Sequence, residues 1–296
     1  LLEPEMERLG YKIKNYYTND SFCGGNDGTL EERDGLLAFL SGQDFFDYNG
    51  NCDRNEVRNS VLGDIYHSQL IEVGAPDGNV IFTDNNQEAY FRTINNYQAF
   101  KSTFDDRRNV LYAGSNSGLL HAFNAETGEE EWAFLPPLLI GKLPTIINDN
   151  LDRTVDNGTR GGSNAIFGVD GSPVVHDVFM TGLQPNGQPE TSPSWHTILF
   201  VPFGRGGSGF TVLDVTNPIL KDNKGPLHMY TVYNDYVNNV VYIADHEGSI
   251  REEPYFSGAV GIQNSLEGQK AMDNLNDAIA QDLSLIHISE PTRRDQ

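Results

Sequence analysis

The 296-residue sequence has no long apolar run and few basic residues. No apolar run reaches the about 18 residues that a membrane-spanning helix needs, so the sequence predicts no membrane span. Lysine and arginine number 20 against 42 aspartate and glutamate residues, which gives a formal net charge of −22. Because so acidic a chain is repelled by phosphate backbones and anionic lipids, nucleic acid and membrane surfaces are poor candidates for partners. A solvated acidic surface is the simpler interpretation of this charge, and a cation-binding site is the other.

The sequence also lacks the signatures of common catalytic sites. Its seven histidines are scattered, and neither H-E-x-x-H nor G-x-S-x-G occurs. Gly204–Gly209 does fit G-x-G-x-x-G, but a dinucleotide-binding turn must open a helix. The residues that follow, Phe210–Val215, have the character of a strand, so we interpret the glycine-rich stretch as a hairpin turn. The acidic turn Asp245–Glu247 is interpreted as solvated rather than catalytic.

The clearest structural signal is a meander of three short strands joined by two tight turns. The apolar pattern predicts strands at Val110–Gly114, Leu119–Asn124 and Glu131–Leu135. Gly118 and Gly128 occupy turn positions that need a positive φ, which glycine adopts at little steric cost. One such meander cannot bury both of its faces, so similar units are expected to pack beside it.

Similar hairpins recur along the chain. Val240–Arg251 matches the first hairpin position by position, and Ile198–Asp214 is a looser copy. The turn glycines lie at 118, 209 and 248, so the gaps between them are 91 and 39 residues. The shorter gap is close to the roughly 40–45 residues of one propeller blade, and the longer gap is about two blades. The sequence therefore predicts an all-β fold, an incomplete (partial) β-propeller of four-stranded blades. A β-sandwich with similar hairpins is the alternative.

A few segments favour helices or loops. Thr29 and Glu32 fit a capping box, and helical spacing of apolar residues continues until Gly42, which predicts a short N-terminal helix. Residues 86–104 predict a short helical or irregular insertion before the meander. Long polar loops are expected at 140–165 and 182–194, and an amphipathic helix that leaves the propeller at 263–280.

Several stretches, taken in order, resemble a known family. Residues 122–128 and Trp132 resemble the blade of quinoprotein-type propellers. The whole ordered set, across about residues 30–255, resembles the PilC/PilY β-propeller family of type IV pilus tip and biogenesis proteins. The stretches that carry this resemblance are Gly63–Ser68, Val73–Pro76, Arg107–Gly114, Leu120–Phe123, Trp132–Pro137, Val169–Pro173 and Leu213–Pro218. No single stretch is specific, but the ordered set is.

The resemblance implies a non-catalytic, exported module that acts in pilus assembly, adhesion and control of retraction. Its implied partners are minor pilins of the pilus tip complex and a surface receptor or substratum. Its implied location is extracellular, at the pilus tip or the outer membrane. The loops at 140–165 and 182–194 are the expected contact surfaces, and Trp132 is expected to pack between blades with its indole N–H bonded to a backbone carbonyl.

Two other classes of protein share the blade pattern. A quinone-dependent dehydrogenase would need a cation and a catalytic aspartate over its cofactor, and the sequence offers no convincing set. An assembly scaffold like the lipoprotein propellers of outer-membrane insertion machinery is the third class.

Oxygen-bearing side chains alternate in the loop after the N-terminal helix, and such alternation lets a tight loop wrap a hard cation such as Ca²⁺. The candidate ligands are Asp47, Asn49, Asn51, Asp53 and Glu56. Cys52 at the sixth position and Arg58 at the twelfth depart from the EF-hand pattern, and only three of the five candidates are charged, so weak affinity is expected. Family members often carry an acidic, glycine-rich loop here, which favours calcium, and calcium modulates some of them. A solvated polar turn is the alternative.

Cys23 and Cys52 are the only cysteines. In an exported protein, which the resemblance implies, such a pair suggests a disulfide. The bond would close a loop of 28 intervening residues, from 24 to 51, and would contribute about 3 kcal/mol to stability. Two unrelated free thiols are the alternative.

The two ends of the chain carry expectations of their own. Residue 1 is leucine and no signal peptide is visible, so the signal of an exported protein is expected upstream. Leu283–Arg293 resembles the in-frame translation of a transposon-type sequencing-library adapter, which implies an interruption of the natural chain near Asp282. The expected parts are an N-terminal helix with the calcium loop at 1–60, a partial propeller at 61–262, an amphipathic helix at 263–282 and a non-native tail at 283–296.

Overall fold

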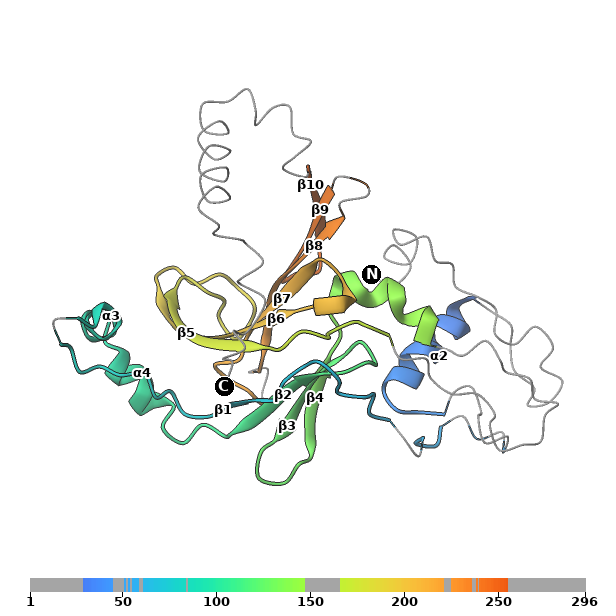
Figure 1. Ribbon diagram of the computed structural model, residues 1–296, viewed down its shortest axis with the longest axis horizontal. Coiled ribbons are helices and arrows are strands. Elements are labelled where there is room, and N and C mark those ends of the chain that lie inside the picture. Colours follow the sequence, from blue (N-terminus) through green and yellow to red (C-terminus); the bar gives the residue numbers. More distant parts are fainter. Residues whose placement is uncertain are drawn as a thin grey trace, which may run out of the picture. The chain divides into compact units, whose positions relative to one another are not determined.

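The computed structural model describes most of the central part of the chain (Figure 1). The described residues are 29–44, 51, 53, 55–58, 61–83, 85–146, 166–220, 225–235, 238 and 240–254. They form mostly β-sheet with few helices, in agreement with the all-β expectation. Among these residues, no helix is both long and apolar enough to cross a membrane.

The chain divides into two compact units. One consists of Leu1–Asn234 with Tyr242–Arg251, and the other of Asp235–Val241 with Glu252–Gln296. The hydrophobic core, the polar junction and the pocket discussed below all lie within the first unit.

The first sheet is a four-stranded antiparallel meander in the order β1-β2-β3-β4. Its strands are β1 (Ile71–Val73), β2 (Val110–Gly114), β3 (Leu120–Asn124) and β4 (Glu130–Phe134). The bounds expected for the last three strands agree to within one residue. Pairing aligns one row of side chains across all four strands, namely Ile71, Tyr112, Ala122 and Trp132. Because one face of the meander carries this apolar row, that face needs a partner.

The second sheet supplies that partner and has six strands in the order β10-β9-β8-β7-β6-β5. The strands are β5 (Val174–Met180), β6 (Ser194–Pro202), β7 (Gly209–Asp214), β8 (Leu227–Asp235), β9 (Val240–Asp245) and β10 (Ile250–Pro254). Val175, Leu199 and Leu213 form a matching apolar row across β5, β6 and β7.

The six-stranded sheet differs from the expected four-stranded unit. The hairpins at 198–214 and 240–251 were expected in separate units, but both belong to this one sheet. The two hairpins share a sheet because β8, which was not predicted as a strand, lies between them. It pairs with β7 along its length, for example Thr211 with Thr231, and lies next to β9.

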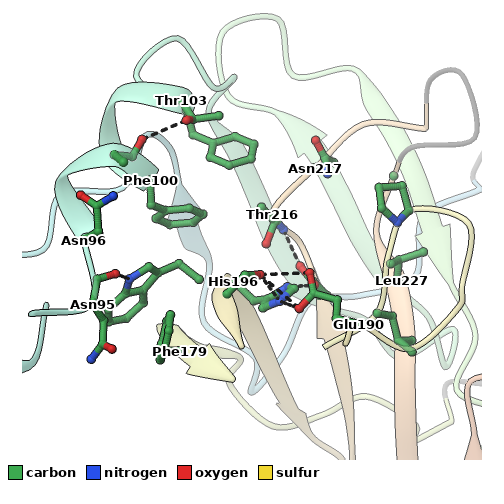
Figure 2. Close-up of a pocket in the computed structure, with 18 residues that line it drawn as sticks. Asn95, Asn96, Phe100, Thr103, Phe179, Glu190, His196, Thr216, Asn217 and Leu227 are labelled. Atoms are coloured by element: carbon green, nitrogen blue, oxygen red, sulfur yellow. Dashed lines mark hydrogen bonds and ion pairs between the residues drawn. The ribbon is translucent and has the colours of Figure 1, made fainter. Parts of the chain in front are cut away.

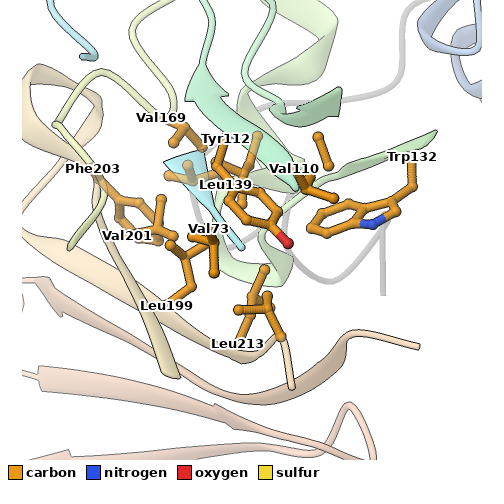
Figure 3. Packing of buried hydrophobic residues seen from close by; sticks show 13 residues of the cluster. Val73, Val110, Tyr112, Trp132, Leu139, Val169, Leu199, Val201, Phe203 and Leu213 are labelled. Atoms are coloured by element: carbon orange, nitrogen blue, oxygen red, sulfur yellow. The ribbon is translucent and has the colours of Figure 1, made fainter. Parts of the chain in front are cut away.

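The two rows meet in one hydrophobic core, where side chains from both sheets point toward one another (Figure 3). The first sheet contributes Val73, Val110, Tyr112, Leu120, Ala122 and Trp132, and β6 and β7, with the residue that follows each, contribute Leu199, Val201, Phe203, Leu213 and Val215. Leu139, from the 3₁₀ segment Pro137–Ile146, and Val169 complete the cluster. Burying each large aliphatic side chain contributes about 1.5–3 kcal/mol, so this packing is the main stabilising contact between the sheets.

Two polar side chains join the edges of this core. The Trp132 indole Nε1–H donates to the Pro218 carbonyl oxygen at 2.7 Å, which confirms the expected bond to a backbone carbonyl. The Arg107 Nε donates to the Gly74 carbonyl at 2.7 Å, and its Nη1 donates to the Thr197 hydroxyl at 2.7 Å. The Trp132 bond links β4 to the segment that follows β7, and Arg107 links the segments beside β1 and β2 to Thr197 on β6.

Helices occupy the insertion before β2 and the N-terminal segment. The insertion contains α3 (Gln87–Ile94) and α4 (Tyr97–Thr103), so its expected helical character is confirmed. Tyr97 fastens α4 to the second sheet, because its hydroxyl donates to the Asp177 carboxylate on β5, which also accepts from Thr197 at 2.6 Å. Near the N-terminus, α2 (Thr29–Leu40) ends just before Gly42, whose φ is +100°.

Arg107 and Arg108 provide a matched pair for testing the junction. Arg107→Lys cannot reproduce the forked donation to Gly74 and Thr197, so we expect the free energy of unfolding to fall by about 2–3 kcal/mol. Arg108 makes an exposed ion pair with Glu131 at 2.5 Å, so Arg108→Lys should change stability by less than about 0.5 kcal/mol. Urea unfolding of both variants measures the difference. Equal effects would contradict the role given to Arg107.

Tyr112 and Tyr97 provide a second pair. Within the described residues, the buried Tyr112 hydroxyl has no hydrogen-bond partner, whereas the Tyr97 hydroxyl is bonded to Asp177. Tyr112→Phe should therefore leave the free energy of unfolding unchanged or raise it by up to about 1 kcal/mol, because it removes an unsatisfied buried group. Tyr97→Phe should lower it by about 1.5–3 kcal/mol, because the bond to a charged acceptor is lost. Thermal unfolding of the two variants would contradict this assignment if their order were reversed.

Candidate functional site

The predicted calcium loop lies only partly within the described residues. Asp47, Asn49 and both cysteines, Cys23 and Cys52, lie outside them. Of the rest, Asn51 Oδ1 accepts from the Asp53 backbone N–H at 2.7 Å, and Asn51 Nδ2 donates to the Glu56 carboxylate at 3.1 Å. The described residues contain no group of three or more histidine, cysteine or acidic side chains placed to hold a metal ion. Calcium binding and the disulfide therefore stay predictions.

The glycine-rich turn is a connection between strands. Gly204–Gly206 forms a single 3₁₀ turn and leads into β7, as the hairpin interpretation predicted. A Cβ atom on Gly206 would overlap the Gly168 backbone, so glycine is needed there for close packing. Lys142 Nζ donates to the Gly206 carbonyl. The motif thus joins backbone segments and does not open a helix toward a phosphate.

The stretches that carry the family resemblance meet in space. Gly74, Arg107, Trp132 and Pro218 belong to four of them, and the polar junction consists of the bonds from Trp132 to Pro218 and from Arg107 to Gly74 and to Thr197 on β6. A fifth and a sixth are joined by His67, whose Nδ1 lies 2.9 Å from the buried Asp170 carboxylate. These residues therefore hold the two sheets and their connecting segments together.

A pocket of about 450 Å³ lies beside this junction (Figure 2). It falls in the size range of small-ligand sites, about 300–1,000 Å³. Phe100 and Phe179 lie on one side, and His196 and Glu190 lie on the other. The remaining lining comes from the insertion, from the loop between β5 and β6 and from the ends of β7 and β8.

His196, on β6, lies between two carboxylates at the pocket wall. Its Nδ1 is 2.6 Å from Asp214 Oδ2 at the end of β7, and its Nε2 is 3.0 Å from Glu190 Oε2 in the β5–β6 loop. The Ser194 hydroxyl is 2.9 Å from the same Nε2 and donates to Glu190 Oε1 at 3.0 Å. Asp214 is fixed in turn by the Thr216 N–H, which donates to Oδ1 at 2.9 Å.

The charges around His196 favour its protonated form. Burial alone lowers the pKa of the imidazole, but the hydrogen bonds and charges of Asp214 and Glu190 outweigh burial and raise that pKa above its ordinary value of 6.5. Burial likewise raises the pKa of Glu190, but the bonds from His196, Gly182 and Ser194 outweigh it and lower that pKa below 4.5. At mildly acidic pH, below 6.5, His196 is thus an imidazolium held between its two acidic partners.

This cluster resembles a nucleophilic triad in composition but not in charge. A triad histidine must be neutral to take the serine proton. The two carboxylates beside His196 favour its cation, and the Ser194 hydroxyl donates to Glu190. The arrangement therefore suits an ion-paired support for the loop better than activation of Ser194.

This cluster was not predicted from the sequence. Its three charged members lie at 190, 196 and 214, and only the pairing of β6 with β7 brings His196 next to Asp214. The one local signal is Ser194 and His196, which lie two residues apart and so share a face of the strand. Their shared partner Glu190 lies in the β5–β6 loop, where no strand or helix periodicity predicts which way a side chain points.

The family comparison matches the core of the chain. A family model described as the PilY1 beta-propeller domain matches residues 62–229. That range contains both apolar rows, the polar junction and the pocket.

Curated relatives agree with this match. The "Type IV pilus biogenesis factor PilY1" of Pseudomonas aeruginosa strain UCBPP-PA14 is 37% identical over 175 residues, which are 59% of this chain and 13% of that protein. A homolog of the same factor in Xylella fastidiosa strain Temecula1 is 34% identical over 222 residues, which are 73% of this chain and 16% of that protein. The chain thus spans less than a fifth of the length of these two relatives.

One solved structure also aligns with the chain. It is described as the "Crystal structure of Pseudomonas aeruginosa PilY1 C-terminal domain" and is 24% identical, covering 54% of this chain and 32% of that one. The TM-score is 0.27, a similarity too low to bear on the fold.

Proposed function

The chain belongs to the PilY1 β-propeller family, and on that premise we propose that it is a non-catalytic module of a type IV pilus biogenesis factor. The module acts in pilus assembly, surface adhesion and control of retraction. The observation that carries the proposal is the family match over residues 62–229. The proposal concerns the activity of the whole protein.

The proposed partners are minor pilins of the pilus tip complex and a surface receptor or substratum. The proposed location is extracellular, at the pilus tip or at the outer membrane. The printed names of the relatives support an association with pilus biogenesis. The loop between β5 and β6, residues 181–193, is a proposed contact surface, because much of it is exposed and it is carried by two paired strands.

The first sheet is proposed to be one four-stranded blade. Its meander order and its single apolar face suit a blade that packs against a neighbour. The described strands number ten, whereas a propeller typically has at least about four blades of four strands. The described residues would therefore make part of a propeller.

Absence of catalysis is part of the proposal. The donation from the Ser194 hydroxyl to the Glu190 carboxylate supports it, because a nucleophilic serine donates to its histidine base. A quinone-dependent dehydrogenase would take up pyrroloquinoline quinone with Ca²⁺ and oxidise alcohols. Tight uptake of this cofactor by the full-length protein, together with alcohol oxidation, would contradict the proposal.

The pilus proposal is tested in a bacterium that carries the gene. Deletion of the segment that encodes residues 62–229 should abolish surface pili and twitching motility, and the intact gene should restore both. Arg108→Lys, a change at an exposed ion pair, is the control and should leave both unchanged. Normal piliation and motility in the deletion strain would contradict the proposed role.

Calcium is proposed as the cofactor of the loop at 47–56. The described Asn51, Asp53 and Glu56 supply oxygen donors within six residues, which suits a hard cation. Calcium should raise the melting temperature of the protein, and the combined change Asp47→Ala and Asp53→Ala should abolish the rise. Asp245→Ala with Glu247→Ala, at the end of β9 and in the turn that follows it, removes the same charge elsewhere and should preserve the rise. A melting curve that calcium does not move would remove the site.

A further inference from the structure

The loop between β5 and β6 makes its side-chain hydrogen bonds to the second sheet through Glu190. Within the loop, Leu183 bridges to Pro189, and the Gln184 N–H donates to the Gln188 carbonyl at 2.8 Å, so the loop is itself a small hairpin. Leu183, Pro185 and Glu190 line the pocket. The position of this hairpin therefore decides how open the pocket is on that side.

Glu190 accepts three kinds of hydrogen bond that hold the loop. His196 Nε2 lies 3.0 Å from its Oε2, and the Ser194 hydroxyl donates to Oε1 at 3.0 Å. The Gly182 N–H donates to Oε2 at 3.2 Å, but Gly182 is at the base of the same loop. Only His196 and Ser194 thus connect the Glu190 carboxylate to β6.

Both of these bonds depend on the proton at Nε2 of His196. A neutral imidazole keeps a single N–H. The buried Asp214 lies closer to the ring, at 2.6 Å, than Glu190 does, at 3.0 Å, so the remaining proton stays on Nδ1. Nε2 then presents a lone pair to the Glu190 carboxylate, and the Ser194 hydroxyl, 2.9 Å away, turns to donate to Nε2. Glu190 loses both of its donors on β6, and the proton passes to water.

We propose that Glu190, Ser194 and His196 form a latch that holds the β5–β6 loop against the pocket, and that loss of the Nε2 proton releases it. The inference does not depend on the proposed function, because it rests on the contacts of the cluster alone. Access to the pocket would then depend on pH.

Asp214 and Glu190 are the titratable side chains that contact the His196 ring. From β7 it faces Asp214, and from the loop it faces Glu190. The pocket-lining residues of the insertion, such as Asn96 and Phe100, carry no titratable group, and neither do those of β8. On the far side, the Arg107 guanidinium reaches the Thr216 carbonyl at 3.5 Å.

The direction of the pH effect follows from the two shifts. Because the pKa of His196 is raised above 6.5, the latch is closed below 6.5 and opens as pH rises through the raised value. Because the pKa of Glu190 is lowered below 4.5, the carboxylate stays charged until pH falls below that value. The closed state thus spans mildly acidic pH and extends toward neutrality.

Proton NMR of the intact chain tests the latch directly. A Cβ atom on Gly182 would lie 2.7 Å from His196 Cε1, so the His196 Hε1 proton should show a nuclear Overhauser effect to the Gly182 α-protons at about pH 6, below the ordinary imidazole pKa. The same Hε1 signal reports the titration midpoint. We expect the midpoint above 6.5 and the Overhauser effect to disappear across it. The equilibrium constant for loop opening can be measured from the exchange of the Gly182 amide, corrected for its intrinsic rate. Between the His196 titration midpoint of the open loop and that of the closed loop, this constant should rise about tenfold for each pH unit.

Glu190→Gln separates the latch from ordinary titration. The side-chain amide that this substitution introduces can accept from a protonated Nε2 or donate to a neutral one, so the loop should stay closed through the titration and the midpoint should fall. Glu247→Gln, a change at a carboxylate in the β9–β10 turn, is the matched control and should leave both the Overhauser effect and the midpoint unchanged. A constant Overhauser effect across the His196 titration in the unchanged protein, or the same loss of it in Glu190→Gln, would overturn the proposal.

Discussion

The packing of two sheets through one apolar face each is the contact on which the rest of the structure depends. The four-stranded meander buries the row through Tyr112 and Trp132, and it can do so only because the row through Leu199 and Leu213 lies opposite. Arg107 and Trp132 then satisfy backbone carbonyls at the edge of this core. Without its bond from Trp132, the buried Pro218 carbonyl would cost about 1–3 kcal/mol.

This contact gives the family resemblance a physical meaning. The resembling stretches are scattered over more than 150 residues of sequence, from Gly63 to Pro218, yet their side chains meet at the sheet junction and at the His67–Asp170 contact. In this chain, these stretches therefore join the two sheets and their connecting segments. Glu190 lies in the adjoining loop, where the same scaffold can carry different contacts.

Sequence patterns predicted local elements better than their partners. The last three strands of the meander were predicted to within one residue because period-2 apolar alternation and turn glycines are local signals, and the bond from the Trp132 indole was anticipated. The six-stranded sheet was not predicted, because no local pattern in Leu227–Asp235 indicates that this segment pairs with β7 and lies next to β9. The His196 cluster was missed for a related reason, since strand pairing alone brings Asp214 beside it. The calcium loop and the disulfide lie largely outside the described residues, so the sequence remains their support.

The Trp132 indole proton reports most directly on the junction between the sheets. Its hydrogen exchange can be followed in a two-dimensional ¹H–¹⁵N spectrum, with the second tryptophan, Trp195, as internal reference, since its own indole donates to the Asn95 carbonyl at 2.8 Å. If the junction exists as described, only global unfolding exposes the Trp132 indole proton. It should then exchange as slowly as the most protected amides of β2 and β3. Exchange at the rate of a solvated indole, while those amides stay protected, would contradict the account.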